Sequence, residues 1–143
     1  MISGRTRKSD SLLFVYGTLR PFTGSSMAVW LLANAVHLGR GRVLGRLYDL
    51  GAYPGMIAAR RDGEWVVGDL YRLRRPGPTL RVLDRYEWGS SGRGRPRFAR
   101  ERRLVELARG STPAWVYLYR LPVSIRARVR RGDYERVAGG TVS

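Results

Sequence analysis

Two parts of the chain contain candidate binding or catalytic residues, and the first is the hexapeptide Val-Tyr-Gly-Thr-Leu-Arg at residues 15–20. An apolar run ends there in a glycine and a hydroxyl residue. Because Gly17 can take backbone angles and allow a close approach that a side chain would forbid, such a turn can direct backbone amides at an anion. Taken alone, however, the hexapeptide is more typical of an ordinary strand end.

The second part contains Glu87, a carboxylate suited to proton transfer. Residues 78–87 favour a short helix, in which Glu87 shares the apolar face with Leu83. Arg81 and Arg85 project elsewhere, so we expect burial without a local cation to raise the pKa of the Glu87 carboxyl. An active-site acid–base and a buried structural glutamate, held by a backbone group or a distant arginine, fit this pattern equally well.

The composition excludes several kinds of active site. The chain has 143 residues, which fits one domain, and it has no cysteine, which excludes thiolate nucleophiles and disulfides. Its single histidine, His37, excludes a multi-histidine metal centre. We therefore expect a site of carboxylates, hydroxyls or arginine, without metal or cofactor. Since no apolar run is long enough to span a membrane, we expect a soluble, cytoplasmic protein with no membrane partner.

The net charge of +16 would suit a partner that carries phosphates. However, Lys8 is the only lysine among the 27 basic residues, and the arginines are scattered along the chain. This distribution favours a generically basic surface over a dedicated nucleic-acid site. We expect nonspecific, salt-dependent adhesion to nucleic acids.

Short elements, most of them strands, must position these residues. Residues 1–11 are polar and are predicted to form a flexible tail, and a single domain is expected over residues 12–143. Residues 102–108 are also compatible with a helix. Strands are predicted at residues 12–16, 43–50, 55–59, 65–73, 98–107 and 114–121.

A first helix is predicted after the glycine turn. Ser25 or Ser26 can cap its start, and it continues through Asn34. Gly39 would end it, which places His37 in the last turn. A histidine there is ordinarily a helix-end or partly buried group, so we assign it no chemistry.

Three patterns concern the strands in more detail. The Asp-Gly pair at residues 62–63 predicts a hairpin. Both faces of the strand at residues 65–73 are largely apolar, which predicts a central position in a sheet. The alternating Trp115, Tyr117 and Tyr119 are more simply one face of a strand than a platform for stacking bases.

Several short motifs follow one another in a fixed order. Together they resemble the gamma-glutamylcyclotransferase-like superfamily, particularly its short members similar to gamma-glutamylamine cyclotransferase. The resemblance extends from Leu12 to about Val137. The motifs are Tyr16-Gly17-Thr18-Leu19, Tyr53-Pro54-Gly55, Gly68-Asp69-Leu70-Tyr71, Leu83-Asp84-Arg85-Tyr86-Glu87, Phe98-Ala99-Arg100, the strand at residues 114–119, and Gly132-Asp133-Tyr134.

The resemblance implies an α+β domain, a small mixed β-barrel flanked by short helices. It implies an enzyme that needs no cofactor and cleaves a gamma-glutamyl amide by attack of the substrate's own α-amine, releasing 5-oxoproline and an amine. Glu87 would be the catalytic acid–base. Arg20, just beyond the loop, is compatible with a plain surface arginine. The substrate-binding residues would be Tyr16, Gly17, Thr18, Leu19 and Arg100.

The chain departs from the family pattern after the glutamate. Trp88 and a loop rich in glycine, serine and arginine at residues 89–97 follow Glu87, where the family usually has a small residue, and this loop is a candidate lid. Phe98 stands where the family often has tyrosine. The alternative to an enzyme is a non-catalytic basic protein of the same fold that binds a small acidic ligand or nucleic acid. The leaving amine and the oligomeric state stay open.

Overall fold

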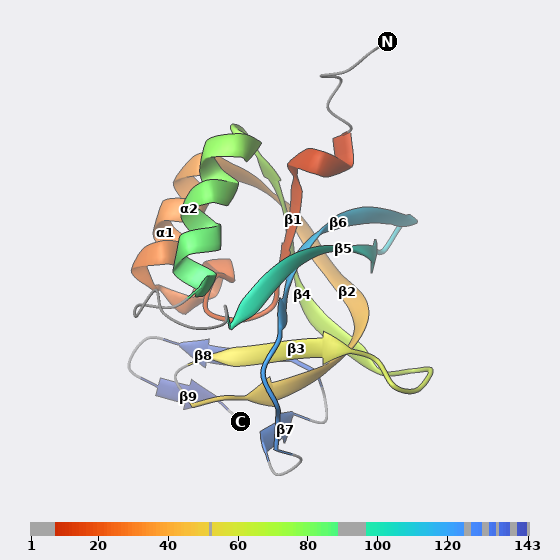
Figure 1. The fold of residues 1–143 in the computed structure, drawn as a ribbon. Coiled ribbons are helices and arrows are strands. Elements are labelled where there is room, and N and C mark those ends of the chain that lie inside the picture. The colour runs from red at the N-terminus through yellow and green to blue at the C-terminus, as the bar shows by residue number, and fades with distance from the viewer. Residues whose placement is uncertain are drawn as a thin grey trace.

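The computed structural model describes residues 8–51, 53–88, 97–124, 127–129, 132–133, 135–137 and 140–142 (Figure 1). For residues 87–88, 135–137 and 140–142 it describes the backbone only. Residues 1–7 of the expected tail lie outside this description, whereas its end forms a 3-10 turn, η1 (Lys8–Ser11). This turn packs on the barrel, since Trp115 Nε1 donates a hydrogen bond to the Asp10 carbonyl at 3.1 Å.

Five strands close into a small mixed barrel, as the resemblance implied. Neighbouring strands are antiparallel except for one parallel pair, in which Leu13 lies opposite Trp115. The pairing of Arg42 with Glu106 joins the first and last strands and closes the barrel. In order around it, the strands are β2 (Ala35–Asp49), β4 (Trp65–Leu73), β1 (Leu12–Val15), β6 (Ser111–Tyr119) and β5 (Phe98–Glu106).

Shorter elements surround the barrel. β3 (Pro54–Ala58) and β7 (Arg128–Val129) pair with the second half of β2, and β8 (Glu135–Val137) with β9 (Gly140–Val142) forms a separate ribbon. A 3-10 turn, η2 (Pro21–Thr23), precedes α1 (Ser26–Asn34). Figure 1 shows α1 and α2 (Pro76–Trp88) on the same side of the barrel. Neither helix, nor any other in the described part of the chain, is long and apolar enough to cross a membrane.

The core has two layers because apolar side chains alternate along the strands. One cluster contains Phe14 of β1 with Val66 and Leu70 of β4. The other contains Tyr71 of β4 and the buried Leu83 of α2, so it joins the barrel to the helices. β4 contributes to both clusters and lies between β2 and β1, which confirms the predicted central strand.

The prediction for the first helix was right at its start and wrong at its end. Ser25 caps the helix, because its Oγ accepts a hydrogen bond from the amide of Ala28 at 3.1 Å. The helix ends at Asn34, and β2 begins at the next residue. His37 therefore lies in a strand opposite Tyr71, not in a last helical turn. The pairing of β2 with β4 outweighs the helical pattern of the local sequence.

Gly39 is likewise not a helix stop. Its φ of 130° falls at an irregularity of the β2–β4 pairing, between His37 and Gly39. Only glycine adopts such an angle readily, so its role is to let a long strand shift register.

Two strand predictions have different outcomes. Residues 62–63 form a turn, with Gly63 at a φ of 82°, but in the described residues β3 and β4 each pair with β2 and not with one another. The predicted hairpin is therefore wrong. By contrast, β5 confirms the strand at residues 98–107, and the helical alternative at residues 102–108 is wrong. β5 pairs with β6 along its whole length, which outweighs the helical pattern.

Candidate active site

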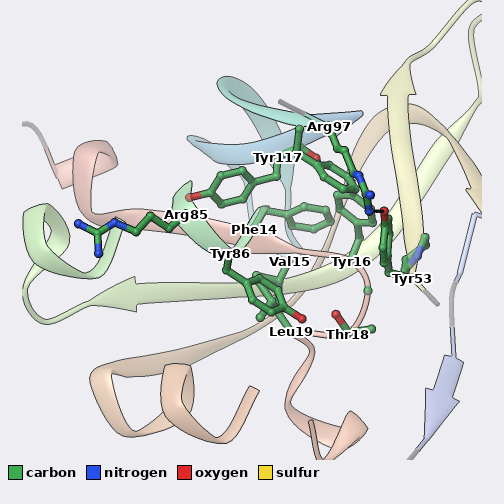
Figure 2. A pocket seen from close by; sticks show the side chains of 13 residues that line it. Phe14, Val15, Tyr16, Thr18, Leu19, Tyr53, Arg85, Tyr86, Arg97 and Tyr117 are labelled. Atoms are coloured by element: carbon green, nitrogen blue, oxygen red, sulfur yellow. Dashed lines mark hydrogen bonds between the residues drawn. The ribbon is translucent and has the colours of Figure 1, made fainter. Parts of the chain in front are cut away.

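A cavity of about 350 Å³ opens where β1 ends. This volume lies near the lower end of the range for small-molecule sites, so it suits a small ligand better than a macromolecule. Figure 2 shows the lining side chains, which come from β1 and the following loop, the start of β3, the end of α2, the start of β5 and the middle of β6. They are residues 14–19, 53–54, 85–86, 97–98 and 117.

The glycine loop lines this cavity with all four predicted residues, Tyr16 to Leu19. In the described chain Gly17 does not have a positive φ, so its backbone angle does not require glycine. Glycine is needed at this position because a side chain would have no space. A Cβ at this position would lie 2.4 Å from Cγ of Pro54. The loop therefore packs directly on the start of β3, and a larger residue would push the two apart.

The carbonyls of the loop are held by its own neighbours. Thr18 O accepts hydrogen bonds from Thr23 Oγ1 at 2.6 Å and from Ser25 Oγ at 2.7 Å, and Gly17 O accepts one from the Arg20 amide at 3.0 Å. By contrast, the amides of residues 17–19 donate to no other described residue. Amides that have no acceptor among the described residues and belong to a cavity wall can donate to a bound anion.

The Tyr16 hydroxyl connects the loop to the barrel by two hydrogen bonds. It donates to the carbonyl of Tyr117 at 2.6 Å and accepts from the amide of Met56 at 3.0 Å. The side chain is buried and its ring forms part of the cavity wall. It thus joins the end of β1 to β6 and β3.

Arg20 is not a surface arginine, and the alternative offered for it from sequence is wrong. It is 0% exposed and pairs with two carboxylates, Asp69 at 2.8 Å and Asp133 at 2.6 Å. Asp69 also lies 2.8 Å from Nε2 of His37. Two motifs that carry the family resemblance, at residues 68–71 and 132–134, therefore meet at the guanidinium of the residue that directly follows a third, residues 16–19.

Arg100, predicted to bind substrate, does not line the cavity. Its Nε and Nη2 donate to the two carboxylate oxygens of Asp84 at 3.0 and 3.2 Å, and its guanidinium stacks on Trp115. The Tyr117 hydroxyl donates to Asp84 as well, at 2.6 Å. Burial would raise the pKa of Asp84, but these bonds from Arg100 and Tyr117 lower it below its usual value. The cluster attaches α2 to β5 and β6.

Glu87 lies in the last turn of α2, directly after Tyr86, which lines the cavity. Leu80 and Leu83 are buried, so the apolar face of this helix is as predicted, and position 87 is one turn beyond Leu83 on that face. The side chain of Glu87 lies outside the described residues. Of the candidate lid at residues 89–97, residues 89–96 do too.

No role was predicted for a further pair, Tyr53 and Arg97. The Nη1 of Arg97 donates to the Tyr53 hydroxyl at 2.7 Å, and both line the cavity. Phe98, which is buried, packs between the rings of Tyr53 and Tyr119 at centroid distances of 5.7 and 5.3 Å. Tyr53 belongs to a family motif, but no spacing pattern connects it with a residue 44 positions later.

Comparisons with known proteins agree with this fold. A family model described as gamma-glutamyl cyclotransferase, AIG2-like, matches residues 13–136. The gamma-glutamylcyclotransferase family protein YtfP of Escherichia coli K12 is 35% identical over 123 residues, which cover 85% of this chain and 94% of YtfP.

Two solved structures share the architecture. An AIG2-like protein (GGACT) from Mus musculus has a TM-score of 0.66 at 23% identity, covering 87% of this chain and 88% of the mouse chain. YkqA from Bacillus subtilis has a TM-score of 0.64 at 25% identity. That match covers 86% of this chain but only 39% of YkqA, so this chain corresponds to less than half of that protein.

Proposed function

The chain belongs to the gamma-glutamyl cyclotransferase, AIG2-like family, and we propose that it cleaves gamma-glutamyl amides. Membership supports a cyclotransferase type of activity. In the proposed reaction the α-amine of the glutamyl group attacks the side-chain amide carbon. One carbon–nitrogen bond forms and one breaks, a proton passes from the attacking to the leaving nitrogen, and the products are 5-oxoproline and an amine.

One observation supports the proposal above all others. The amides of residues 17–19 donate to no other described residue, and these three residues line the cavity together with Arg85 and Tyr86 of α2. Such donors suit the substrate's α-carboxylate or the oxyanion that forms at the attacked carbon, where preorganised donors contribute about 3 kcal/mol each. The loop would thus hold the glutamyl head.

The reaction needs no protein nucleophile. Because both reacting groups belong to one molecule, the site must hold the glutamyl chain curled, and this enforced proximity supplies much of the rate. Glu87 is the proposed acid–base, taking a proton from the attacking nitrogen and giving it to the leaving one. A group with both tasks works best with a pKa near the operating pH.

The test is an assay for 5-oxoproline with a panel of gamma-glutamyl dipeptides and gamma-glutamyl amines. We expect the wild-type protein to turn over part of the panel, and Glu87→Gln to lose about 100-fold or more of kcat, as is usual when a general acid–base is removed. Asp62→Asn is the matched control, because it makes the same carboxylate-to-amide change in an exposed turn.

Two outcomes would contradict the proposal at different levels. If Glu87→Gln were as active as the wild type, Glu87 would have no part in the mechanism. If no member of the panel released 5-oxoproline, the chain would be a non-catalytic binding protein of this fold.

A further inference from the structure

We propose that Arg97, held by Tyr53, binds a carboxylate on the leaving amine and so selects gamma-glutamyl amino acids and peptides over gamma-glutamyl amines that lack this group. The inference rests on the proposed function and names its substrate class. Four features of the cavity support it. They are the position of the Arg97 guanidinium, the charge of the wall, the donors of the glycine loop and the aromatic wall.

The first feature is the position of the guanidinium. Arg97 directly precedes β5, and Figure 2 shows its side chain reaching Tyr53 at one side of the cavity. The 2.7 Å bond from Nη1 to the Tyr53 hydroxyl fixes one edge of the group. Its other N–H donors bond to no other described residue and form a planar fork, and this arrangement matches the two oxygens of a carboxylate.

The second feature is the charge of the wall. Among the residues whose side chains the structure describes, those that line the cavity include two cations, Arg85 and Arg97, and no carboxylate. Within the described chain neither arginine forms an ion pair. An anionic end of a substrate would gain an ionic partner here, whereas a cationic amine would meet repulsion, which is a direct source of specificity.

The two arginines are not equivalent. In Figure 2 the Arg85 side chain extends away from Tyr53 and Arg97, on the other side of the cavity. No described residue anchors it by a hydrogen bond or an ion pair. Arg97 is anchored, and ordering it therefore costs less entropy when a ligand binds.

The third feature is that the glycine loop and Arg97 would bind different anionic groups of the substrate. In the proposed function, the amides of residues 17–19 are the donors for the α-carboxylate or the oxyanion of the glutamyl head. The positive charge of Arg97 is thus left for a second anionic group, and in a gamma-glutamyl amino acid that group is the carboxylate of the leaving residue.

The fourth feature is the aromatic wall beside the guanidinium. Phe98 packs on Tyr53 and Tyr119, and this cluster continues the apolar lining next to Arg97. Such a wall suits an apolar or aromatic side chain on the leaving residue. We therefore choose gamma-glutamyl-phenylalanine as the probe.

The first experiment compares two substrates that differ only in the carboxylate, gamma-glutamyl-phenylalanine and gamma-glutamyl-phenethylamide. The ratio of their kcat/KM values measures carboxylate preference. We expect the wild type to prefer the dipeptide and Arg97→Met to lower the ratio about tenfold, as for loss of one charged hydrogen-bonded partner. Arg97→Lys keeps the charge but lacks the planar guanidinium, so its ratio should lie between those of Arg97→Met and the wild type.

Arg109→Met is the matched control, since it removes the same charge from an exposed position away from the cavity. It should leave the ratio unchanged. If Arg97→Met lowers both kcat/KM values equally, Arg97 binds the glutamyl head instead, and the inference is wrong. An unchanged ratio in Arg97→Met would also overturn it.

A second experiment separates this inference from the proposed function. Glutaryl-phenylalanine and glutaryl-phenethylamide lack the α-amine, so they cannot cyclise, and their binding is measured by calorimetry. Tighter binding of the acid, lost in Arg97→Met, supports the inference even if no gamma-glutamyl compound is turned over. Equal binding of the two compounds to the wild type rejects it even if 5-oxoproline is released.

Discussion

Arg20 shows how one buried side chain can hold the glycine loop in place. It lies in the core with its guanidinium between Asp69 and Asp133, and its amide donates to Gly17 O. Charges removed from water are costly unless they are paired, so each partner of this cluster depends on the other two. The conformation of the loop therefore depends on residues that never touch the cavity.

We expect Arg20→Met to destabilise the folded protein. Removing the cation leaves two carboxylates without their partner, and we expect the free energy of unfolding to fall by about 3 kcal/mol, as when a buried pair is broken. Urea denaturation measures this change. Arg72→Met, on an exposed position of β4, is the control and should stay close to the wild type. An Arg20→Met protein as stable as the control would show that the cluster contributes little.

A second prediction concerns pH and Glu64. Burial by itself raises the pKa of this carboxyl, but the amides of Arg60 and Arg61 and the guanidinium of Arg46 lower it to about 2. A lowered pKa in the folded state stabilises the protein above the ordinary value of 4.5, and this stabilisation is lost as the pH falls toward about 2.

Urea denaturation over this acidic range should therefore show a falling free energy of unfolding. In Glu64→Gln the fall should be shallower, because the titrating group is gone. Glu106→Gln removes an exposed carboxylate and should keep the wild-type dependence. Equal slopes in Glu64→Gln and the wild type would contradict the assignment.

The start of α1 is coupled to the glycine loop of the candidate site. Ser25 Oγ accepts from the amide of Ala28, which caps α1, and donates to Thr18 O in the loop. At the other end of the site, Asp84 connects α2 to Arg100 of β5 and Tyr117 of β6. Both walls of the cavity are therefore attached to the barrel through polar side chains.

A prediction follows for this cap. Ser25→Ala removes the acceptor of the helix amide and the donor to the loop, so we expect it to destabilise the protein by about 1 kcal/mol. Ser26→Ala makes the same change one residue later, at an exposed position in the first turn, and serves as the control. The two variants are compared by urea denaturation, and equal stabilities would exclude a capping role for Ser25.

The whole molecule is a closed barrel with an excess of positive charge. Closure through the β2–β5 pairing leaves one core cluster on each side of the β4 strand. The net charge of +16 attracts polyanions irrespective of sequence. In the described residues many arginines are paired with carboxylates, as Arg42 is with Glu106, which disperses the remaining charge.

We therefore predict weak, nonspecific adhesion to nucleic acids. Duplexes of unrelated sequence should bind equally, and binding should weaken steeply with added salt because counterions are released on association. Fluorescence anisotropy over a salt series measures both properties. Binding that ignored salt, or that favoured one sequence, would instead indicate a dedicated nucleic-acid site.

Local patterns were enough for several parts of this protein. The strand that ends before Gly17, the cap at Ser25, the central strand β4 and the apolar face of α2 all follow from neighbours in the chain, because capping, alternation and helical periodicity act over a few residues. The glycine loop and the position of Glu87 could thus be predicted as candidates. The family resemblance supplied the closed barrel.

The tertiary structure alone decided which distant residues meet. Arg20 is buried because its carboxylates come from residues 49 and 113 positions away, and Arg97 meets Tyr53 across 44 positions. β2 replaced the end of the predicted helix because β4 pairs with it. Such contacts depend on how the barrel closes, and the residues that neighbour a side chain in sequence do not predict that closure.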